Sequence, residues 1–312
     1  MTAAPRDLGG LVVLVTGAAS GIGAAVAGLA ADRGATPVLL DRDGDGVRER
    51  VSALRTREPP GGRALGVAAD VTDEASVRSA VGSALQRLGR IDLVVTCAGV
   101  SGPVGSRLEE VSLADWQRVF AVNVTGAYLT LKHTLASQRR SPHGAAVLVA
   151  SDSALVAAPG MVPYCASKAA VVQLARALSV ETAGEVRVNA VCPSVVDTPM
   201  SRGDLQVPDF TDAAHPVHRP EDIAEHVLFL APPSGRGDPR SGGDPGLRLL
   251  GAVGLPRVSR ARSRGSRART HKPARPAGAE NRPRVADDTE VRTWTVTRTC
   301  WPPWRCRRAV GR

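Results

Sequence analysis

Residues 162–178, VPYCASKAAVVQLARAL, form a helix-like stretch with two side chains that can exchange or hold a proton. Tyr164, one of only two tyrosines in the chain, lies four residues before Lys168. Residues four apart share one face of a helix, so the phenol and the ammonium can point to the same place. A free phenol has a pKa of about 10, and a neighbouring positive charge favours the phenolate. Such a tyrosine could exchange a proton with an alcohol or ketone oxygen during hydride transfer.

A glycine-rich turn, TGAASGIG at residues 16–23, follows an apolar run and leads into a helical segment. Gly17 permits a tight turn, Gly21 lets the backbone approach a pyrophosphate, and Gly23 allows a helix to pack closely on a strand. The helix N-terminus offers free N–H groups and the positive end of its dipole to an anion. Three glycines alone are a weak signal, but their place after the first strand predicts a dinucleotide site.

Asp41 ends the second apolar run, about twenty residues after the glycine-rich turn. A carboxylate there accepts hydrogen bonds from ribose hydroxyls and repels a 2′-phosphate, which favours NAD(H) over NADP(H). The adjacent Arg42 partly offsets that repulsion, and the alternative is that Asp41 only caps a helix. Asp70 ends the third run, where it could form a turn or meet an adenine edge. Together with the glycine-rich turn, we interpret Asp70 as a cofactor contact.

The elements that must position these side chains alternate along residues 1–231. Short runs that are apolar on both faces predict buried parallel strands, and amphipathic segments between them predict helices, such as the one opening on Thr72 and closing at Gly89. Repeated strand–helix units predict an α/β fold, a doubly wound parallel sheet of the Rossmann type in a single domain. The predicted strands are 11–17, 36–43, 64–70, 91–99, 145–151 and 186–193.

The charge of the chain divides it at the same place. Residues 1–231 carry 21 Lys and Arg against 24 Asp and Glu, whereas residues 232–312 carry 19 against 6. Residues 232–312 are rich in Arg, Pro and Gly and show no periodicity, which predicts a disordered basic tail. We hypothesise that this tail derives from a shifted reading frame; the alternative is a true tail that binds polyanions. The basic charge belongs to residues 232–312, so it does not indicate nucleic-acid binding by residues 1–231, and we do not expect such binding there.

Together these motifs resemble the short-chain dehydrogenase/reductase family over residues 10–231. TGAASGIG is similar to that family's cofactor motif, and YCASK is similar to its Tyr-x-x-x-Lys centre. The resemblance implies that Tyr164 is the acid/base and that Lys168 lowers its pKa and binds the nicotinamide ribose. It also implies that Ser151 binds the substrate oxygen and that Asn123, in VNVTG, positions a water in a proton relay to Lys168.

The resemblance extends to the segment NAVCPSVVDTP, residues 189–199, where it implies that Thr198 contacts the nicotinamide carboxamide. Met200 and residues 201–218 would then form part of a mobile lid over the substrate. The histidines show no metal spacing, so no metal site is predicted. The predicted cofactor contacts are Gly17, Ser20, Gly21, Ile22, Gly23, Asp41, Asp70, Val71, Gly99, Tyr164, Lys168 and Thr198.

Three features depart from the family pattern. Cys97 stands where an Asn usually braces neighbouring strands, and Cys cannot donate as an amide does. Ser194 replaces a Gly, which would restrict the backbone if a positive φ is needed there. Arg- and Pro-rich sequence after residue 231 replaces the expected final strand. Loss of that strand would expose a sheet edge and argues against a tetramer, while a homodimer through the Tyr-bearing helix and the preceding helix stays open.

The function predicted is hydride transfer between NAD(H) and a secondary alcohol or ketone, a small molecule whose identity the sequence does not specify. The rival activity is an NADPH-linked 3-ketoacyl-type reductase, and the rival class is a non-catalytic or unstable dinucleotide-binding relative. No signal peptide or membrane span is apparent, and five cysteines without paired spacing indicate a reducing compartment, so we expect the cytoplasm.

Overall fold

The computed structural model describes residues 8–56, 64–213, 216–230 and 249–251. They form one parallel sheet with the strand order β3-β2-β1-β4-β5-β6-β7. The chain moves outward from β1 to β3 and then returns to build the other half from β4, so the crevice between β1 and β4 is a topological switch point. The predicted fold class is therefore confirmed. The strands are β1 Val12–Thr16, β2 Thr36–Asp41, β3 Leu65–Ala68, β4 Leu93–Thr96, β5 Ala145–Val149, β6 Arg187–Cys192 and β7 Leu249–Gly251.

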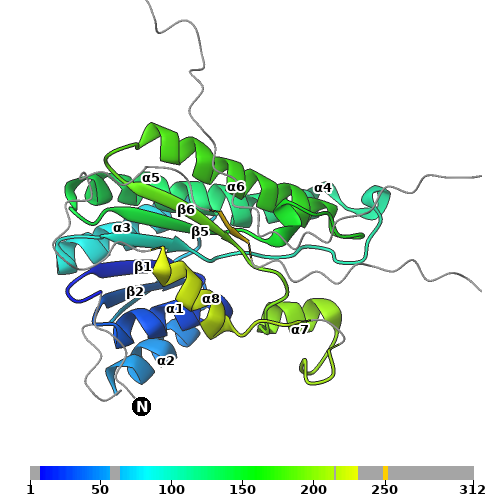
Figure 1. The fold of residues 1–312 in the computed structure, drawn as a ribbon, viewed down its shortest axis with the longest axis horizontal. Helices are drawn as coiled ribbons and strands as arrows, with labels where there is room; N and C mark the ends of the chain where they lie inside the picture. The colour runs from blue at the N-terminus through cyan, green and yellow to red at the C-terminus, as the bar shows by residue number, and fades with distance from the viewer. Residues whose placement is uncertain (1–7, 57–63, 214–215, 231–248, 252–312) are drawn as a thin grey trace, which may run out of the picture. The chain divides into compact units, whose positions relative to one another are not determined.

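Helices cover both faces of the sheet, as Figure 1 shows, with α1 and α8 on one side and α3, α5 and α6 on the other. Alternate residues of β1 belong to the two cores, since Val13 and Val15 pack beneath α1 while Val12 and Leu14 face α3. The helices are α1 Gly21–Asp32, α2 Gly44–Arg55, α3 Glu74–Leu88, α4 Leu113–Phe120, α5 Gly126–Arg140, α6 Val162–Glu181, α7 Pro199–Leu205 and α8 Pro220–Phe229, with short turns η1 Leu108–Glu110, η2 Ala121–Thr125 and η3 Asp152–Ala154.

Local signals in the sequence explain where these helices begin and end. Asp73 caps α3 by accepting a hydrogen bond from the Ala75 amide, so the predicted start at Thr72 is one residue early. Gly89 ends α3 in the left-handed region, as predicted. Proline occupies the first turn of α6 and α8, where its missing N–H costs no hydrogen bond. Within the described part of the chain, no helix is long and apolar enough to cross a membrane.

One prediction for the C-terminal region is wrong. The sequence analysis expected no strand after residue 231, but Leu249–Gly251 form β7, which pairs in parallel with Ala190–Cys192 of β6. The LLG segment is long enough to fill three positions of the parallel ladder, but it is too short to show a strand periodicity within the surrounding sequence. The other residues of 232–312, and with them the predictions of disorder, polyanion binding and a shifted frame, lie outside the described residues.

A buried carboxylate joins three strands where they begin. Asp92 is fully buried, and its Oδ2 accepts a hydrogen bond of 2.9 Å from the Val12 amide of β1. Its Oδ1 accepts from Arg90 Nε at 2.9 Å and from the Ser141 hydroxyl. Its backbone carbonyl accepts from Ala145, the first residue of β5. Asp92 therefore holds β1, β4 and β5 together at their amino ends, opposite the end of the sheet that carries the glycine-rich turn.

We predict that Asp92→Ala lowers the free energy of unfolding by about 2–4 kcal/mol. The substitution leaves the buried Val12 amide and the Arg90 guanidinium without their acceptor. Denaturant unfolding of purified protein measures the change. Glu181→Ala, at an exposed position at the end of α6, is the control and should change stability by less than about 0.5 kcal/mol. Equal effects of the two substitutions would contradict the role given to Asp92.

Candidate active site

The glycine-rich turn lies at the carboxyl end of β1, against the segment that follows β4. Gly17 has a φ of 67°, and a Cβ there would lie 2.8 Å from the Ala98 amide nitrogen. A Cβ on Gly23 would lie 2.2 Å from the Gly17 carbonyl oxygen, which is closer than atoms can approach. These two positions therefore exclude every residue with a side chain. The turn brings α1 close to β1 and β4, as the spacing predicts.

The N-terminus of α1 fits an anion. Ser20 is the N-cap residue, but its side chain makes no capping hydrogen bond and the first turn of α1 contains no acidic residue. Gly21 adopts a φ of 54°, and a Cβ there would lie 3.2 Å from the methyl group of Thr198. Ile22 packs against the core beneath the turn. The free N–H groups and the positive end of the helix dipole are therefore available to a phosphate.

Asp41 lies at the end of β2, beside this turn. Its Oδ2 accepts a hydrogen bond from the Ala19 amide at 3.1 Å, and its Oδ1 accepts from the Asp43 amide at 3.1 Å. The residue that caps α2 is Asp43, which accepts from the Gly46 amide. The alternative reading of Asp41 as a helix cap is therefore wrong. The carboxylate stays half-buried at the edge of the predicted dinucleotide site with lone pairs to spare.

Asp70 forms a turn of its own. Its Oδ1 accepts from both the amide and the hydroxyl of Thr72 at 2.8 Å, and these bonds hold the pKa of Asp70 below its usual value. The side chain is exposed, and its hydrogen bonds within the described part of the chain do not join it to the glycine-rich turn. Val71 is buried and packs against Gly126 at the start of α5. The structure supports turn formation by Asp70, and its cofactor contact stays a prediction.

Tyr164 and Lys168 lie one turn apart near the start of α6, both buried. Lys168 Nζ lies 5.5 Å from the centroid of the Tyr164 ring and donates a hydrogen bond of 3.0 Å to the carbonyl of Val149, the last residue of β5. A Cβ on Gly99 would lie 3.5 Å from that Nζ and 3.4 Å from Asn123 Oδ1. The absent side chain of Gly99 therefore leaves the lysine open toward the carboxyl edge of the sheet.

Ser151 lies two residues beyond the end of β5 and is buried. Its hydroxyl accepts from the Ser153 amide at 3.1 Å and donates to Asp152 Oδ1 at 3.1 Å, and it lies near enough to Tyr164 to act on the pKa of the phenol. Ser153 has its hydroxyl 3.5 Å from the same carboxylate oxygen of Asp152. The serine and the tyrosine therefore present two hydroxyl groups at one point.

Asn123 lies in a single π-helical turn, η2, between α4 and α5. Its Oδ1 accepts from the Val100 amide at 2.8 Å, and its Nδ2 donates to the Val100 carbonyl and to Ser167 Oγ, both at 2.9 Å. Ser167 in turn donates to the Tyr164 carbonyl at 2.7 Å. Sequence reasoning missed Ser167; its one signal is a hydroxyl within the apolar face next to Lys168. Single π turns are frequent at functional sites.

Burial controls the protonation of the central pair. It raises the pKa of Tyr164 to about 12, with a hydrogen bond from Ser151 acting the other way and the carboxylates of Asp152 and Asp204 adding to the rise. Burial also lowers the pKa of Lys168 to about 8. The side chains of this chain alone therefore do not lower the pKa of Tyr164, because the loss of water dominates and the nearby carboxylates add to the rise.

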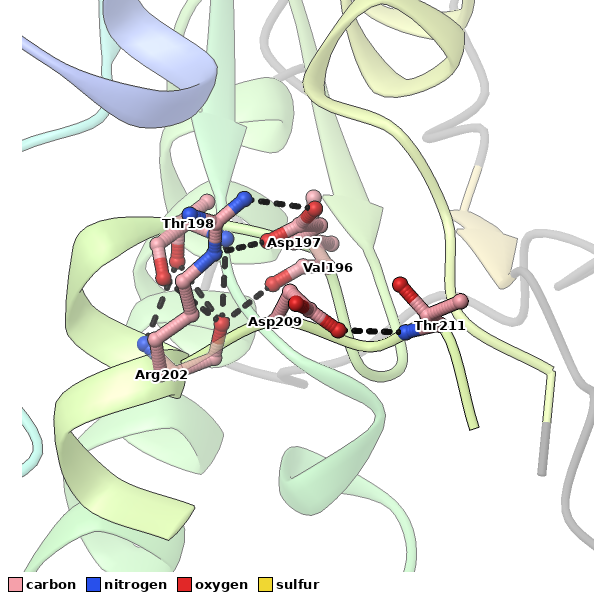
Figure 2. A network of polar contacts seen from close by, with 7 residues as sticks. Val196, Asp197, Thr198, Arg202, Asp209 and Thr211 are labelled. Carbon is pink, nitrogen blue, oxygen red and sulfur yellow. Dashed lines mark hydrogen bonds and ion pairs between the residues drawn. The ribbon is translucent and has the colours of Figure 1, made fainter. Parts of the chain in front are cut away.

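The segment after β6 places Thr198 beside the glycine-rich turn, and Figure 2 shows the polar network around it. Thr198 caps α7 by accepting from the Ser201 amide at 3.2 Å, and Ser201 donates to the Val196 carbonyl. Arg202 forms a two-pronged ion pair with Asp197, with Nε–Oδ1 2.6 Å and Nη2–Oδ2 2.9 Å. These bonds fix the base of α7 over the carboxyl end of the sheet.

The two residues that depart from the family pattern fit their places. The amides of Cys97 and Ala98 both donate to Thr16 Oγ1 at 3.2 Å, so β4 and β1 are bridged by a hydroxyl. Burial raises the pKa of the Cys97 thiol to about 12, which leaves it uncharged. Ser194 does not adopt a positive φ; among the described non-glycine residues only Gln206 does. The backbone restriction expected at Ser194 if φ were positive therefore does not arise.

Comparison with known proteins agrees with this geometry. A family model described as "Enoyl-(Acyl carrier protein) reductase" matches residues 17–237. The chain belongs to the short-chain dehydrogenase/reductase family. It is 39% identical over 230 residues to 2-(S)-hydroxypropyl-CoM dehydrogenase 3 of Xanthobacter autotrophicus, covering 70% of this chain and 88% of that protein. It is 40% identical over 225 residues to cis-4-hydroxycyclohexanecarboxylate dehydrogenase of Sinomonas cyclohexanicum, with coverage of 70% and 88%.

A solved short-chain reductase has the same fold. The 3-ketoacyl-(acyl-carrier-protein) reductase from Brucella melitensis, complexed with NADH, is 31% identical, with a TM-score of 0.67 over 78% of this chain and 97% of that one. Members of the short-chain dehydrogenase/reductase family use NAD(P), and this chain is an oxidoreductase that acts on CH–OH groups of small molecules. No group of potential metal ligands occurs among the described residues of this family member.

We predict that Tyr164 makes stability depend on pH above 10. Its folded pKa of about 12 exceeds the unfolded value of 10.0, so its contribution is present below pH 10 and is lost as pH rises toward 12. Denaturant unfolding of the native protein and of Tyr164→Phe at pH 9 and pH 11 measures this. The native protein should lose about 1 kcal/mol more than the variant between the two pH values. An equal loss of stability in both proteins would contradict the raised pKa of Tyr164.

Proposed function

We propose that this protein is an NAD(H)-preferring dehydrogenase of secondary alcohols, with Asn123, Ser151, Tyr164 and Lys168 as its catalytic residues. The observation that carries the proposal is that Tyr164 lies one helical turn before the buried Lys168, with Ser151 near enough to act on its pKa, at the end of the sheet that also holds the glycine-rich turn. The dehydrogenase names of the relatives at 39% and 40% identity support the same chemistry.

The residues divide the work of alcohol oxidation. Tyr164 accepts the hydroxyl proton of the substrate as the carbonyl forms, and Ser151 donates a hydrogen bond to the same oxygen. The bound nicotinamide supplies the hydride acceptor and, when oxidised, a positive charge that favours the phenolate. The glycine-rich turn and the N-terminus of α1 hold the pyrophosphate, and Thr198 holds the carboxamide. In ketone reduction Tyr164 returns the proton.

Lys168 and Asn123 support the tyrosine. The pKa of Lys168, about 8, is close to neutral pH. Lys168 can therefore pass a proton toward solvent when Tyr164 returns to the phenolate form. Asn123 uses both amide hydrogens and one oxygen lone pair within the protein, which leaves one lone pair for a water beside Lys168. The place of Gly99 between Nζ and Oδ1 provides the room for that water.

We predict that Tyr164→Phe lowers kcat for a secondary alcohol by at least about a hundredfold, because the proton acceptor is removed. NADH affinity should stay within about threefold of the native value, because only one hydroxyl is lost beside the cofactor. Nicotinamide absorbance measures turnover, and fluorescence titration measures NADH binding. Thr182→Val is the control, because it removes a hydroxyl group at the far end of the same helix, and it should leave turnover unchanged. Retained turnover in Tyr164→Phe would refute the assignment.

The preference for NAD(H) rests on Asp41. Its carboxylate lies half-buried between the Ala19 and Asp43 amides, which fixes a negative charge beside the glycine-rich turn. A fixed charge accepts ribose hydroxyls and repels a 2′-phosphate. Arg42 is exposed and forms no ion pair with a described residue, so it only partly offsets that charge. NADP(H) is the less favoured cofactor in this proposal.

We predict that Asp41→Asn reduces the ratio of NADH affinity to NADPH affinity by about tenfold or more, because the repulsive charge is lost while one acceptor oxygen remains. Fluorescence titration with each cofactor measures the ratio. Glu49→Gln, an exposed site on α2, makes the same change in net charge and should leave the ratio unchanged. A native protein that prefers NADPH would overturn the cofactor proposal.

The alternative activity is an NADPH-linked 3-ketoacyl-type reductase. The fold match to the Brucella melitensis 3-ketoacyl-(acyl-carrier-protein) reductase supports its ketone substrate, but that enzyme was complexed with NADH and so does not favour NADPH. The affinity ratio above and a panel of ketones distinguish it from the proposed dehydrogenase. A non-catalytic dinucleotide-binding protein would instead gain thermal stability from NADH and turn over nothing.

Location and assembly complete the proposal. We place the protein in the cytoplasm, in keeping with free thiols at Cys97, Cys165 and Cys192. A homodimer through α5 and α6 is supported by the exposed side chains of Tyr128 and Val180 on those helices, which are 46% and 78% exposed.

A further inference from the structure

Two carboxylates stand at the substrate end of the site. Asp152 directly follows Ser151 and accepts hydrogen bonds from the hydroxyls of Ser151 and Ser153 at 3.1 and 3.5 Å. Asp204 lies in the last turn of α7, the helix that follows Thr198. The electrostatic field of both carboxylates reaches the Tyr164 hydroxyl, where each disfavours the phenolate. Two negative charges from different segments of the chain therefore act on the catalytic phenol.

Asp204 is held in place from the other side of the site. The hydroxyl of Ser101, in the segment after β4, donates a hydrogen bond to Asp204 Oδ2. Ser101 is 6% exposed and Asp204 is half-buried, so this bond lies where charge is screened less than in bulk water. A residue 103 positions earlier in the chain thus fixes the Asp204 carboxylate against the segment after β4.

Neither carboxylate is neutralised within the described part of the chain. The carboxylates of Asp152 and Asp204 accept hydrogen bonds from serine hydroxyls, and neither forms an ion pair with a described residue. Arg202, the cation on α7, is engaged by both oxygens of Asp197, as Figure 2 shows. Lys168 Nζ lies 5.5 Å from the centroid of the Tyr164 ring, but two carboxylates act on the phenol, so the substrate end of the site carries a net negative charge.

The rest of this end is apolar. Leu155, just after η3, is 56% exposed, while Met200 and Leu205 on α7 are 41% and 47% exposed. Large apolar side chains left in water on both segments that carry the carboxylates indicate a surface that a substrate covers. Apolar walls with fixed negative charges suit a hydrophobic alcohol without an anionic group.

Resting on the function proposed above, we propose that Asp204, together with Asp152, makes this site select uncharged or cationic secondary alcohols and reject anionic ones. A substrate carboxylate or phosphate would have to approach two negative charges, neither of which is paired with a cation among the described residues. A single unit charge about 6 Å away in such surroundings changes affinity by about tenfold or more. Asp204 is the specificity residue that can be changed, because Asp152 is bonded directly to catalytic Ser151.

The test compares two compounds of the same shape and different charge. Cis-4-hydroxycyclohexanecarboxylate is anionic at neutral pH, and cis-4-hydroxycyclohexanecarboxamide is its neutral counterpart. We measure kcat/KM for both with NAD, and Kd for both in the presence of NADH, in the native protein and in Asp204→Asn. The asparagine keeps an acceptor for Ser101. Glu181→Gln, 17 residues beyond Tyr164 and so about 25 Å along α6, makes the same change in net charge far from the site.

We expect the native protein to favour the carboxamide by about tenfold or more in both kcat/KM and Kd. Asp204→Asn should reduce this ratio at least about threefold, and Glu181→Gln should leave it unchanged. A native ratio near one, or an equal loss on both compounds in Asp204→Asn, would overturn the inference while leaving the dehydrogenase proposal intact. Binding of the carboxamide with the expected ratio but no turnover would instead contradict the proposed function. Failure of both compounds to bind would count against the inference.

Discussion

The side-chain amide of Asn123 is the contact on which the site depends. It joins three segments that are distant in sequence: the π turn between α4 and α5, the strand-end segment at Val100, and Ser167 on α6. The Ser167 hydroxyl then reaches the backbone of Tyr164 itself. Because Asn123 and Ser167 are buried and Val100 is half-buried, loss of one partner would leave buried groups unsatisfied. The position of the tyrosine is thus set by a polar network inside the protein and not by packing alone.

The same burial gives the site its chemical character. Removal from water disfavours the charged form of each group, which raises the pKa of Tyr164 to about 12 and lowers the pKa of Lys168 to about 8. At neutral pH the phenol is therefore uncharged, whereas Lys168 is still mostly protonated and close to its pKa. The carboxylates of Asp152 and Asp204 strengthen this preference from the substrate side.

The parts of the site that the sequence predicts are those that depend on local conformation. The glycines at 17, 21 and 23 follow from the turn they must make, and Tyr164 and Lys168 follow from helix periodicity. Contacts between distant residues could not be predicted, since nothing in the spacing connects Ser101 to Asp204 or Asn123 to Ser167. The pKa of Tyr164 depends on burial, which is a tertiary property. The short strand β7 was not predicted, because three residues are too few to show the alternation of a strand.

Asp92 places the strongest polar lock of the sheet at its amino end, whereas the chemistry lies at its carboxyl end. Five residues of extended chain separate Asp92 from Cys97, a distance of about 16 Å. Stability and catalysis are therefore spatially divided along the strands. A protein built this way can accept new loops and altered lids at one end without weakening the framework at the other, which leaves its substrate range open to change.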